Sequence, residues 1–479
     1  MFFQIFFVNL QNIKTRNMQV KNNGHLYEQL RKQYPVFVFE SYTYKIIDGD
    51  IHIRFKYTAG SDIVMEPCTI IKNHEEYRHF FSGHSLQDLD TLFFQLGMAE
   101  LISYWKAVCS PTVKILVGSL DADAVDFWKK LYFNGLGEFF YINGINATEA
   151  DFMQIESPSA QMMPKMDVNL LSKTIVPIGG GKDSVVTLEA LRQQEDIIPL
   201  IINPRGATLE CAQKAGFEGN FFEINRTISP ALLDLNAKGY LNGHTPFSAM
   251  LAFYTLLVAC LSGRKNIALS NESSANESTV RGMNVNHQYS KSLEFESDFR
   301  QYTSRYIHSE LNYYSFLRPI TELQIASLFA QCEPYHYSFK SCNAGSKQNI
   351  WCCNCAKCLF TFIILSPFID GDTLEKMYGE NLLDKESLLD YLQELCGMKP
   401  TKPFECVGTI DEVNLSLSHT AGLYKGRALP ALLKYYVQTP QYAQYKQLSL
   451  NMALQQWSDE HFLSKEGEKV LKTWLKIKE

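Results

Sequence analysis

The sequence predicts an α/β protein built around a doubly wound parallel sheet, with an N-terminal α+β domain and a mostly helical C-terminal region. Two observations support this class. Apolar strands alternate with helical segments from residue 175 to residue 269, the pattern of a parallel sheet covered by helices. A run of three glycines joins one of these strands directly to a helix. The expected domains are residues 1–160, 170–370 and 371–479.

The composition is that of an ordered globular protein without a basic surface. The chain has 479 residues, 46% hydrophobic and 13% aromatic. A formal net charge of −6 argues against a nucleic-acid partner but allows a local basic cleft for phosphates. Twelve cysteines, several of them clustered, are typical of a reduced compartment and a metal site rather than of disulfide bridges.

Neither apolar stretch of the sequence predicts export or membrane insertion. Residues 1–10 lack a preceding basic segment and a following cleavage site, and Met18 is an alternative natural start to Met1. The longest apolar run, residues 249–261, is too short to cross a bilayer. We therefore expect a cytoplasmic protein without a membrane partner.

Residues up to about 160 predict an α+β domain in which we find no chemical motif. Alternation of apolar and polar residues predicts its strands, and apolar residues at helical spacing predict its helices. The predicted elements are strands at 37–39, 51–57, 63–65 and 115–117 and helices at 86–107 and 124–133. This domain is interpreted either as a core or as a substrate-binding cap. The predicted linker to the sheet is residues 157–164.

The glycine run lies in residues 175–184, Ile-Val-Pro-Ile-Gly-Gly-Gly-Lys-Asp-Ser. An apolar strand precedes the glycines and a helix follows them. Glycine lets backbone N–H groups approach an anion closely, and the helix points its N-terminal amides at the same place. Ser184 offers a further donor, and Asp183 offers a carboxylate for Mg²⁺ bound to phosphates. A glycine turn without a ligand is the alternative.

Further strands are predicted at 197–202, 221–224 and 267–269, separated by helices at 208–215 and 246–261. Ligands of such sheets bind beyond the carboxyl ends of the strands, so the loops after residues 178, 202 and 269 should share one pocket. The loop after residue 269 is dense in polar groups. We interpret it as part of the ligand-binding site, and a solvated surface loop is the alternative. The candidate ligands of a polyanionic substrate are Glu272, Arg281, Lys291 and Arg318, and Glu272 also suits a second Mg²⁺.

Four cysteines have the type and spacing of a zinc site. Cys352-x-x-Cys355-x-x-Cys358 follows Cys342 within a short span, and Zn²⁺ takes four thiolates tetrahedrally. Cys353 is an alternative ligand to Cys352. Free buried cysteines are the alternative to a metal site.

Residues 399–408, Lys-Pro-Thr-Lys-Pro-Phe-Glu-Cys-Val-Gly, form a segment that two prolines hold extended. It presents Glu405 and Cys406. A thiolate acts as a base when nearby cations lower its pKa, so Cys406 is a candidate base. The alternative is that Cys406 is a small core residue. His287 titrates near working pH and is the candidate partner, with Glu405 and His244 as further candidates for the base.

The turn at residues 179–184 resembles the PP-loop of the N-type ATP pyrophosphatases, Ser-Gly-Gly-x-Asp-Ser, with Gly179 in place of the first serine. This family cleaves ATP between the α and β phosphates and adenylates a carboxylate or carbonyl oxygen. The resemblance implies a sheet of the adenine nucleotide alpha hydrolase type. The ATP-binding residues are then Gly179, Gly180, Gly181, Lys182, Asp183, Ser184 and Asn203, with Asp183 on Mg²⁺.

In combination, the segments described above resemble the bacterial UDP-N-acetylmuramoyl-L-alanyl-L-glutamate epimerases, over about residues 85–420. They are the glycine turn, residues 270–277, residues 287–296, the cysteine cluster and residues 402–408. The resemblance implies ATP-dependent inversion of the terminal L-glutamate of a UDP-linked muramoyl dipeptide through carboxylate adenylation, releasing AMP and pyrophosphate. It makes Cys406, Glu405 and His287 the catalytic candidates and ATP, Mg²⁺ and Zn²⁺ the expected cofactors.

Two other functions are open at this point. One is another PP-loop ligase, such as a 7-cyano-7-deazaguanine synthase or a tRNA-modifying enzyme, which the cysteine pattern favours and the acidic net charge weakens for tRNA. The other is a non-catalytic, zinc-stabilised binding module. The intact Lys182-Asp183-Ser184 sequence argues against the second.

Overall fold

The computed structural model describes residues 20–157, 162–280 and 285–477. Met1, Met18, Arg281 and residues 158–161 of the predicted linker lie outside these residues. The described strands are β1 (Val36–Ile47), β2 (Asp50–Ala59), β3 (Ile63–Met65), β4 (Cys68–Ile71), β5 (Thr112–Ile115), β6 (Gln154–Glu156), β7 (Leu171–Pro177), β8 (Ile197–Ile202), β9 (Phe222–Thr227), β10 (Arg264–Leu269) and β11 (Asn312–Ser315).

These strands form a single sheet of eleven strands within the described residues, in the order β11-β10-β7-β8-β9-β4-β2-β1-β5-β6, with β3 paired to β2. From β7 the chain moves outward in both directions, through β8 and β9 on one side and through β10 and β11 on the other, and all these neighbours are parallel. Their carboxyl ends therefore share one edge, and the direction of winding changes between β7 and β10. The predicted α/β class with a mostly parallel central sheet is confirmed.

The N-terminal strands continue this sheet. β4 pairs antiparallel with β9, from Cys68↔Thr227 to Ile71↔Ile224, and β2 and β1 follow antiparallel beyond it. β4 was not among the predicted strands: its Cys-Thr-Ile-Ile sequence shows no clear apolar alternation. The sheet is continuous across the predicted boundary at residue 160, and the division into three domains stays a prediction.

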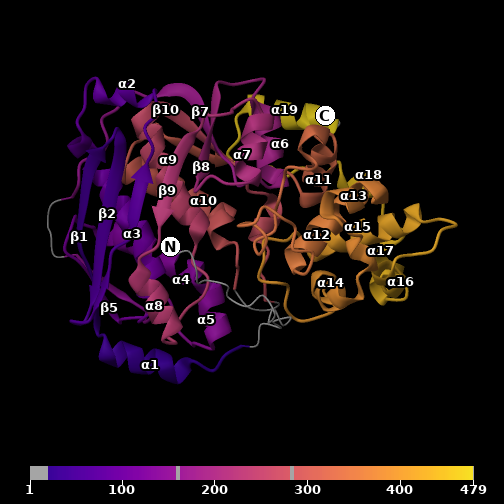
Figure 1. Cartoon of the computed structure of the whole chain (residues 1–479), viewed down its shortest axis with the longest axis horizontal. Coiled ribbons are helices and arrows are strands. Elements are labelled where there is room, and N and C mark those ends of the chain that lie inside the picture. Colours follow the sequence, from indigo (N-terminus) through magenta and orange to yellow (C-terminus); the bar gives the residue numbers. More distant parts are fainter. Residues whose placement is uncertain (1–19, 158–161, 281–284, 478–479) are drawn as a thin grey trace, which may run out of the picture.

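Helices lie on both faces of the sheet, and the C-terminal helices gather at the end opposite β1 and β2 (Figure 1). They are α1 (Gly24–Gln33), α2 (Tyr77–Phe81), α3 (Asp90–Trp105), α4 (Ala122–Gly135), α5 (Gly137–Asn143), α6 (Lys182–Leu191), α7 (Ala207–Lys214), α8 (Pro230–Ala237), α9 (Phe247–Ser262), α10 (Leu293–Tyr306), α11 (Glu322–Ala330), α12 (Ala356–Leu365), α13 (Gly371–Tyr378), α14 (Leu389–Leu395), α15 (Ile410–Leu423), α16 (Ala431–Tyr436), α17 (Pro440–Tyr445), α18 (Leu450–Ala453) and α19 (Lys465–Leu475). The mostly helical C-terminal region is confirmed.

Two apolar cores lie on opposite faces of the parallel strands. Successive strand residues point to opposite faces, and accordingly Ile175 of β7 belongs to one core and Val176 to the other. The first core contains α3 and α9, and the second contains α6, α11 and α12. Every residue of α3 except Asp90 is buried, which explains its apolar sequence. Among the helices that the structure describes, none is long and apolar enough to cross a membrane.

Candidate active site

A cavity of about 480 Å³ opens at the carboxyl ends of β7, β8 and β10, the predicted ligand-binding edge. Its walls come from the loops after these strands and from the segments that carry Lys291, Lys357 and Cys406. The predicted site residues that line it are Gly179, Gly181, Asp183, Ser184, Asn203, Lys291, Cys342 and Cys406. The fold thus joins the glycine turn to a thiol that lies far from it in the sequence.

The glycine turn joins β7 to α6 with Gly181 as the N-cap residue. Gly180 has a φ of +76°, and a Cβ at this position would lie 2.8 Å from the backbone of Ala207, so only glycine fits. A Cβ at Gly179 would meet no atom within 4 Å, which leaves the backbone open on that side. The first N–H groups of α6 have no partner inside the helix, so the turn suits an anion.

Lys182 does not line the cavity. Its side chain is 3% exposed, and its ammonium forms ion pairs with Asp183 and with Glu322 of α11. Burial lowers the pKa of Lys182, but the two carboxylates outweigh it and the pKa is raised. This lysine therefore carries a fixed positive charge beneath the glycine turn.

Three carboxylates lie next to this lysine. Ligand oxygens of Asp183, Glu272 and Glu322 are all within 4.8 Å of one another. Oε2 of Glu272 is buried without a hydrogen-bond partner in the described residues. Burial raises the pKa of Glu322, the ammonium of Lys182 opposes this, and the charges of Asp183 and Glu272 add to it. A set of oxygen ligands with an unpaired carboxylate atom fits a hard divalent cation.

Asn203 and Arg318 are bonded to other parts of the fold. Asn203 lines the cavity with a φ of 50°, and its amide group is hydrogen-bonded to the backbone N–H and C=O of Arg226 in β9. Arg318, predicted to contact substrate, is 1% exposed. It pairs with Glu296 at 3.1 Å and donates to the carbonyl oxygens of Glu272 and Lys291. This burial differs from the predicted contact, because the guanidinium instead holds the loop after β10.

Cys406 lies at the cavity between two ammonium groups. Nζ of Lys291 is 3.4 Å from its Sγ, and Lys357 donates a hydrogen bond to its carbonyl oxygen. Burial raises the pKa of Cys406, but Lys291, a hydrogen bond with His287 and the charge of Lys357 outweigh burial and lower it to about 6. The thiol is therefore ionised at neutral pH, as a base or nucleophile requires.

His287 is brought to Cys406, as predicted for the partner. Its Nδ1 lies 2.5 Å from Oε2 of Glu138 in α5, and the ring of His244 lies 4.4 Å away. Burial lowers the pKa of His287, but the bonds to Cys406 and Glu138 raise it to about 10. Burial, the charge of His287 and Lys106 lower the pKa of His244 to about 3. The arrangement is a thiolate beside an imidazolium, with a neutral second imidazole.

Glu405, the third catalytic candidate, is hydrogen-bonded to the residue that follows Cys342. Its Oε2 accepts a hydrogen bond of 2.6 Å from Nδ2 of Asn343. Burial raises the pKa of Glu405. The positive charge of Lys357 lowers this pKa, and the negative charge of Cys406 raises it further. The geometry thus favours Cys406 and His287 as the reactive pair.

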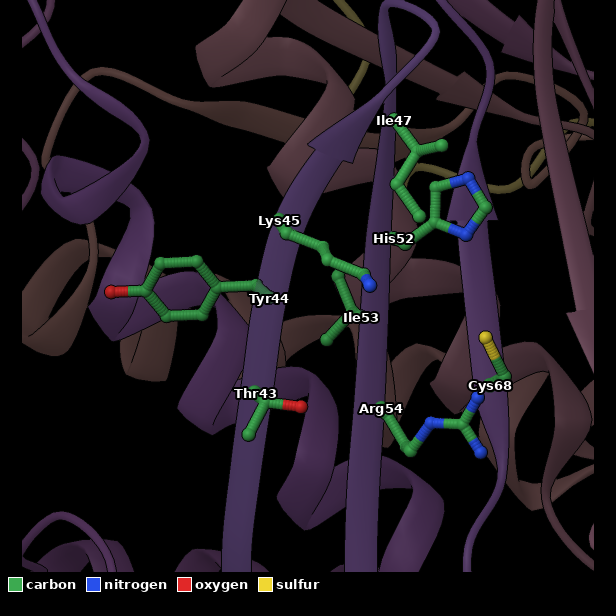
Figure 2. A pocket seen from close by; sticks show the side chains of 8 residues that line it. All are labelled: Thr43, Tyr44, Lys45, Ile47, His52, Ile53, Arg54 and Cys68. Carbon is green, nitrogen blue, oxygen red and sulfur yellow. The ribbon is translucent and has the colours of Figure 1, made fainter.

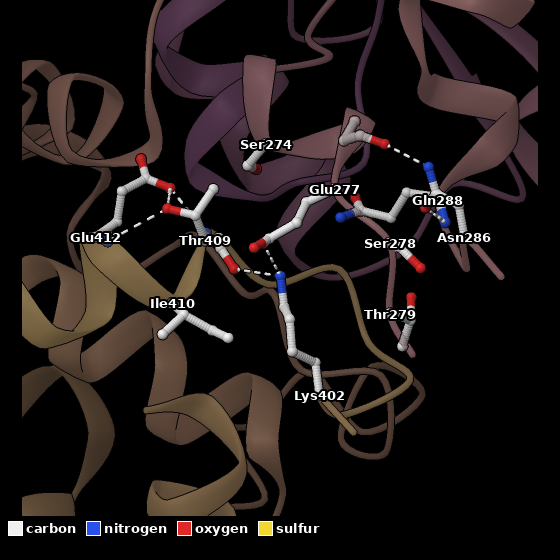
Figure 3. A network of polar contacts seen from close by, with 12 residues as sticks. Ser274, Glu277, Ser278, Thr279, Asn286, Gln288, Lys402, Thr409, Ile410 and Glu412 are labelled. Atoms are coloured by element: carbon white, nitrogen blue, oxygen red, sulfur yellow. Dashed lines mark hydrogen bonds and ion pairs between the residues drawn. The ribbon is translucent and has the colours of Figure 1, made fainter. Parts of the chain in front are cut away.

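The segment that carries Cys406 is held against the loop after β10 (Figure 3). Lys402 forms an ion pair with Glu277, and its Nζ donates to the carbonyl oxygen of Gly408 at 2.8 Å. Its backbone N–H donates to Thr279 at 3.0 Å, beside an isolated bridge between Val280 and Thr401. This clamp sets the position of Cys406 relative to the loop that carries His287.

The sulfur atoms of Cys342, Cys352, Cys355 and Cys358 are gathered at the start of α12, all within 4.8 Å of one another. Sγ of Cys358 lies 3.7 Å from that of Cys352 and 3.5 Å from that of Cys355. A tetrahedral Zn²⁺ with bonds of about 2.3 Å would place sulfurs roughly 3.8 Å apart, so this set fits zinc. Sγ of Cys353 instead contacts the carbonyl oxygen of Tyr378 at 3.4 Å, outside the cluster.

A smaller hollow of about 290 Å³ lies on the outer face of β1 and β2 (Figure 2). Thr43, Lys45, His52 and Arg54 line it, and Lys45 is directly opposite His52. It contains none of the predicted site residues. It is separate from the chemistry at the carboxyl edge.

Fold and site together define an α/β protein in which a glycine turn at a helix N-terminus and a thiol with a lowered pKa share one cavity. The models of the MurL N-terminal domain and the MurL C-terminal domain match residues 28–316 and 338–471. The chain belongs to the UDP-N-acetylmuramoyl-L-alanyl-L-glutamate epimerase family.

Three similar proteins carry the name UDP-N-acetyl-alpha-D-muramoyl-L-alanyl-L-glutamate epimerase. The protein from Xanthomonas oryzae pv. oryzae is 36% identical over 64% of this chain and 69% of its own. Those from Micromonospora sp. and Salinispora tropica are each 31% identical, over 85% and 82% of this chain and 91% and 86% of their own. No solved structure matches the chain.

Proposed function

We propose that this protein is a cytoplasmic, ATP-dependent epimerase of peptidoglycan precursor synthesis. It inverts the terminal L-glutamate of UDP-N-acetylmuramoyl-L-alanyl-L-glutamate to D-glutamate and releases AMP and pyrophosphate. The observation that carries the proposal is that the glycine turn and the Cys406 thiol line the same cavity. The names of the relatives support the substrate.

Adenylation explains why both halves of the cavity are needed. A proton beside a free carboxylate is hard to remove, because the carbanion would form next to existing negative charge. Joining the carboxylate to AMP neutralises it and lets the developing charge spread onto the carbonyl oxygen. A base can then take the proton on one face, an acid returns one on the other, and hydrolysis releases AMP.

The glycine turn is the proposed pyrophosphate site, which makes the central sheet of PP-loop type. A Cβ at Gly179 would meet no atom within 4 Å, which leaves space for phosphate near the start of α6, and Gly181 and Ser184 line the cavity beside it. Asp183, Glu272 and Glu322 would hold Mg²⁺, which neutralises phosphate charge when bound. Lys340 and Arg205 also line the cavity and suit the anionic groups of the UDP-linked substrate.

Cys406 is the proposed base, and three cations surround it. The ionised thiol accepts the α-proton, while Lys291, Lys357 and the His287 imidazolium favour negative charge at the reacting carbon. The pair with His287 keeps the sulfur ionised at neutral pH. The cavity therefore offers a base where negative charge develops.

One zinc ion per chain is expected on Cys342, Cys352, Cys355 and Cys358, because their sulfurs have tetrahedral spacing. Its role is to stabilise the junction before α12, since such sites form as the chain folds. Metal analysis should find zinc in wild type, less in Cys355→Ser and Cys358→Ser, and an unchanged amount in the control Cys353→Ser. Equal zinc in all four proteins would contradict this site.

The cysteine cluster also favours a second candidate, another PP-loop ligase that adenylates a different carbonyl. The test is incubation with the L-alanyl-L-glutamate nucleotide precursor, ATP and Mg²⁺, followed by acid hydrolysis and chiral analysis of the glutamate. Epimerase activity gives D-glutamate together with AMP. AMP formation with other acceptors, and L-glutamate alone from this precursor, would favour the ligase. A binding module would leave ATP intact.

A further inference from the structure

The N-terminal part of the chain reaches the proton-transfer pair through α5. Glu138 lies in the first turn of this helix, and its side chain is 11% exposed. Oε2 of Glu138 is 2.5 Å from Nδ1 of His287 and 3.6 Å from Nδ1 of His244. A buried carboxylate at this distance orients an imidazole and stabilises its protonated form.

Helix α5 also contacts both segments that supply the pair. A Cβ at Gly137 would lie 3.7 Å from Val285, close to His287 in the chain. The ring of Tyr141 lies 5.5 Å from that of Phe404, two residues before Cys406. Glu138 is therefore held between the two loops rather than on a free surface.

The charged groups around the pair come from several elements. Lys291, Lys357 and Glu405 act on Cys406 from the loop after β10, from α12 and from the segment of Cys406 itself. His244 and Lys106 lie on the side of Glu138, and Nζ of Lys106 donates to the carbonyl oxygen of Gly243. Among the described residues acting on His287, Glu138 and Cys406 are the negative groups that raise its pKa.

We propose that Glu138 is the positioning residue of the site: it holds His287 charged and oriented against Cys406, so that the N-terminal region completes the proton-transfer machinery. The catalytic meaning of this contact rests on the proposed epimerase function, but the contact itself can be tested without substrate or ATP. With Glu138 present, the charge of the imidazolium stabilises the thiolate. A neutral side chain in its place would leave His287 neutral and the sulfur more basic.

The experiment measures how fast iodoacetamide alkylates Cys406 as a function of pH, with the peptide that contains Cys406 quantified by mass spectrometry. In wild type the rate should rise with a midpoint near pH 6, because the thiolate is the reacting form. In Glu138→Gln the midpoint should move up by about one pH unit, so that alkylation below pH 6 slows about tenfold. Glu28→Gln removes an exposed carboxylate elsewhere and should match wild type.

Two further variants separate positioning from a merely structural role. Glu138→Asp keeps the carboxylate and should recover part of the wild-type profile. In a His287→Gln background, Glu138→Gln should cause no further shift, because both changes remove the same interaction. Circular dichroism checks that each variant is folded.

An unchanged midpoint in folded Glu138→Gln overturns the proposal, and so does a full additional shift in the His287→Gln background. Two imidazoles and a carboxylate can also bind a transition metal. A metal ion bound to wild type in addition to that of the cysteine cluster, and lost in Glu138→Gln, would assign the three side chains to a metal and overturn the proposal. Failure to convert the glutamate precursor would count against the proposed function alone, since alkylation needs neither reactant.

Discussion

The Cys406→Ala variant should still form AMP from ATP and substrate but lose exchange of the glutamate α-proton. The thiol is the ionised group of the proposed proton-transfer pair, and Lys291, His287 and Lys357 lower its pKa to about 6 against burial. Removing a positioned base slows proton transfer on the order of 10² to 10⁴-fold. The adenylation half of the cavity keeps its residues in this variant, so the two reactions should separate.

The measurement is deuterium incorporation at the α-carbon in D₂O, with AMP followed in the same samples. Cys68→Ala is a suitable control, because Cys68 lies on β4 away from the cavity. Deuterium uptake by Cys406→Ala at the wild-type rate would make Cys406 a packing residue. The base would then have to be sought among Glu405, His244 and His287.

Asp183→Asn should lower ATP turnover on the order of 10²-fold, and Ser184→Ala should act in the same direction, as expected when a preorganised charge-stabilising group is lost. Asp183 joins the carboxylate set suited to Mg²⁺ and also pairs with Lys182. Removing its charge weakens both interactions. Zinc content should not change, because the thiol cluster is separate.

Product analysis by anion-exchange chromatography checks this prediction, with Asp372→Asn as the control. Asp372 is likewise in the first turn of a helix, but it is exposed and lies outside the cavity. Wild type should give AMP and pyrophosphate only with substrate and Mg²⁺. ADP and orthophosphate as the products would contradict a pyrophosphatase turn.

The central sheet could be predicted because its signals are local. The apolar run at β8 was predicted with its observed limits, and the glycine turn marked the step from β7 to α6. Cys406 was singled out by the segment that it shares with the epimerase family, and His287 by its place in the loop predicted to face the nucleotide. Their role as a reactive pair stays a prediction. The cysteine spacing likewise pointed to a cluster that the fold brings together.

Other site residues carry no local signal. Glu138 and Lys357 act through partners far along the chain. Glu138 is in no recognisable motif, and Lys357 occupies a position inside the cysteine motif that the zinc spacing leaves unspecified. Glu322 looks like an ordinary acidic residue in the first turn of a helix, and only tertiary packing brings it to Lys182. Arg318 was predicted as a substrate ligand because arginine suits a polyanion. The sequence does not show that the fold buries it against Glu296.

The central claim is that the two ends of the cavity act on one substrate in sequence. The most direct test is α-deuterium uptake by the dipeptide substrate in D₂O, compared with ATP and Mg²⁺ present, without nucleotide, and with an ATP analogue that cannot be cleaved between the α and β phosphates. We predict uptake only with ATP, accompanied by AMP and D-glutamate. Equal uptake without nucleotide would contradict the claim, because the thiol would then work without adenylation.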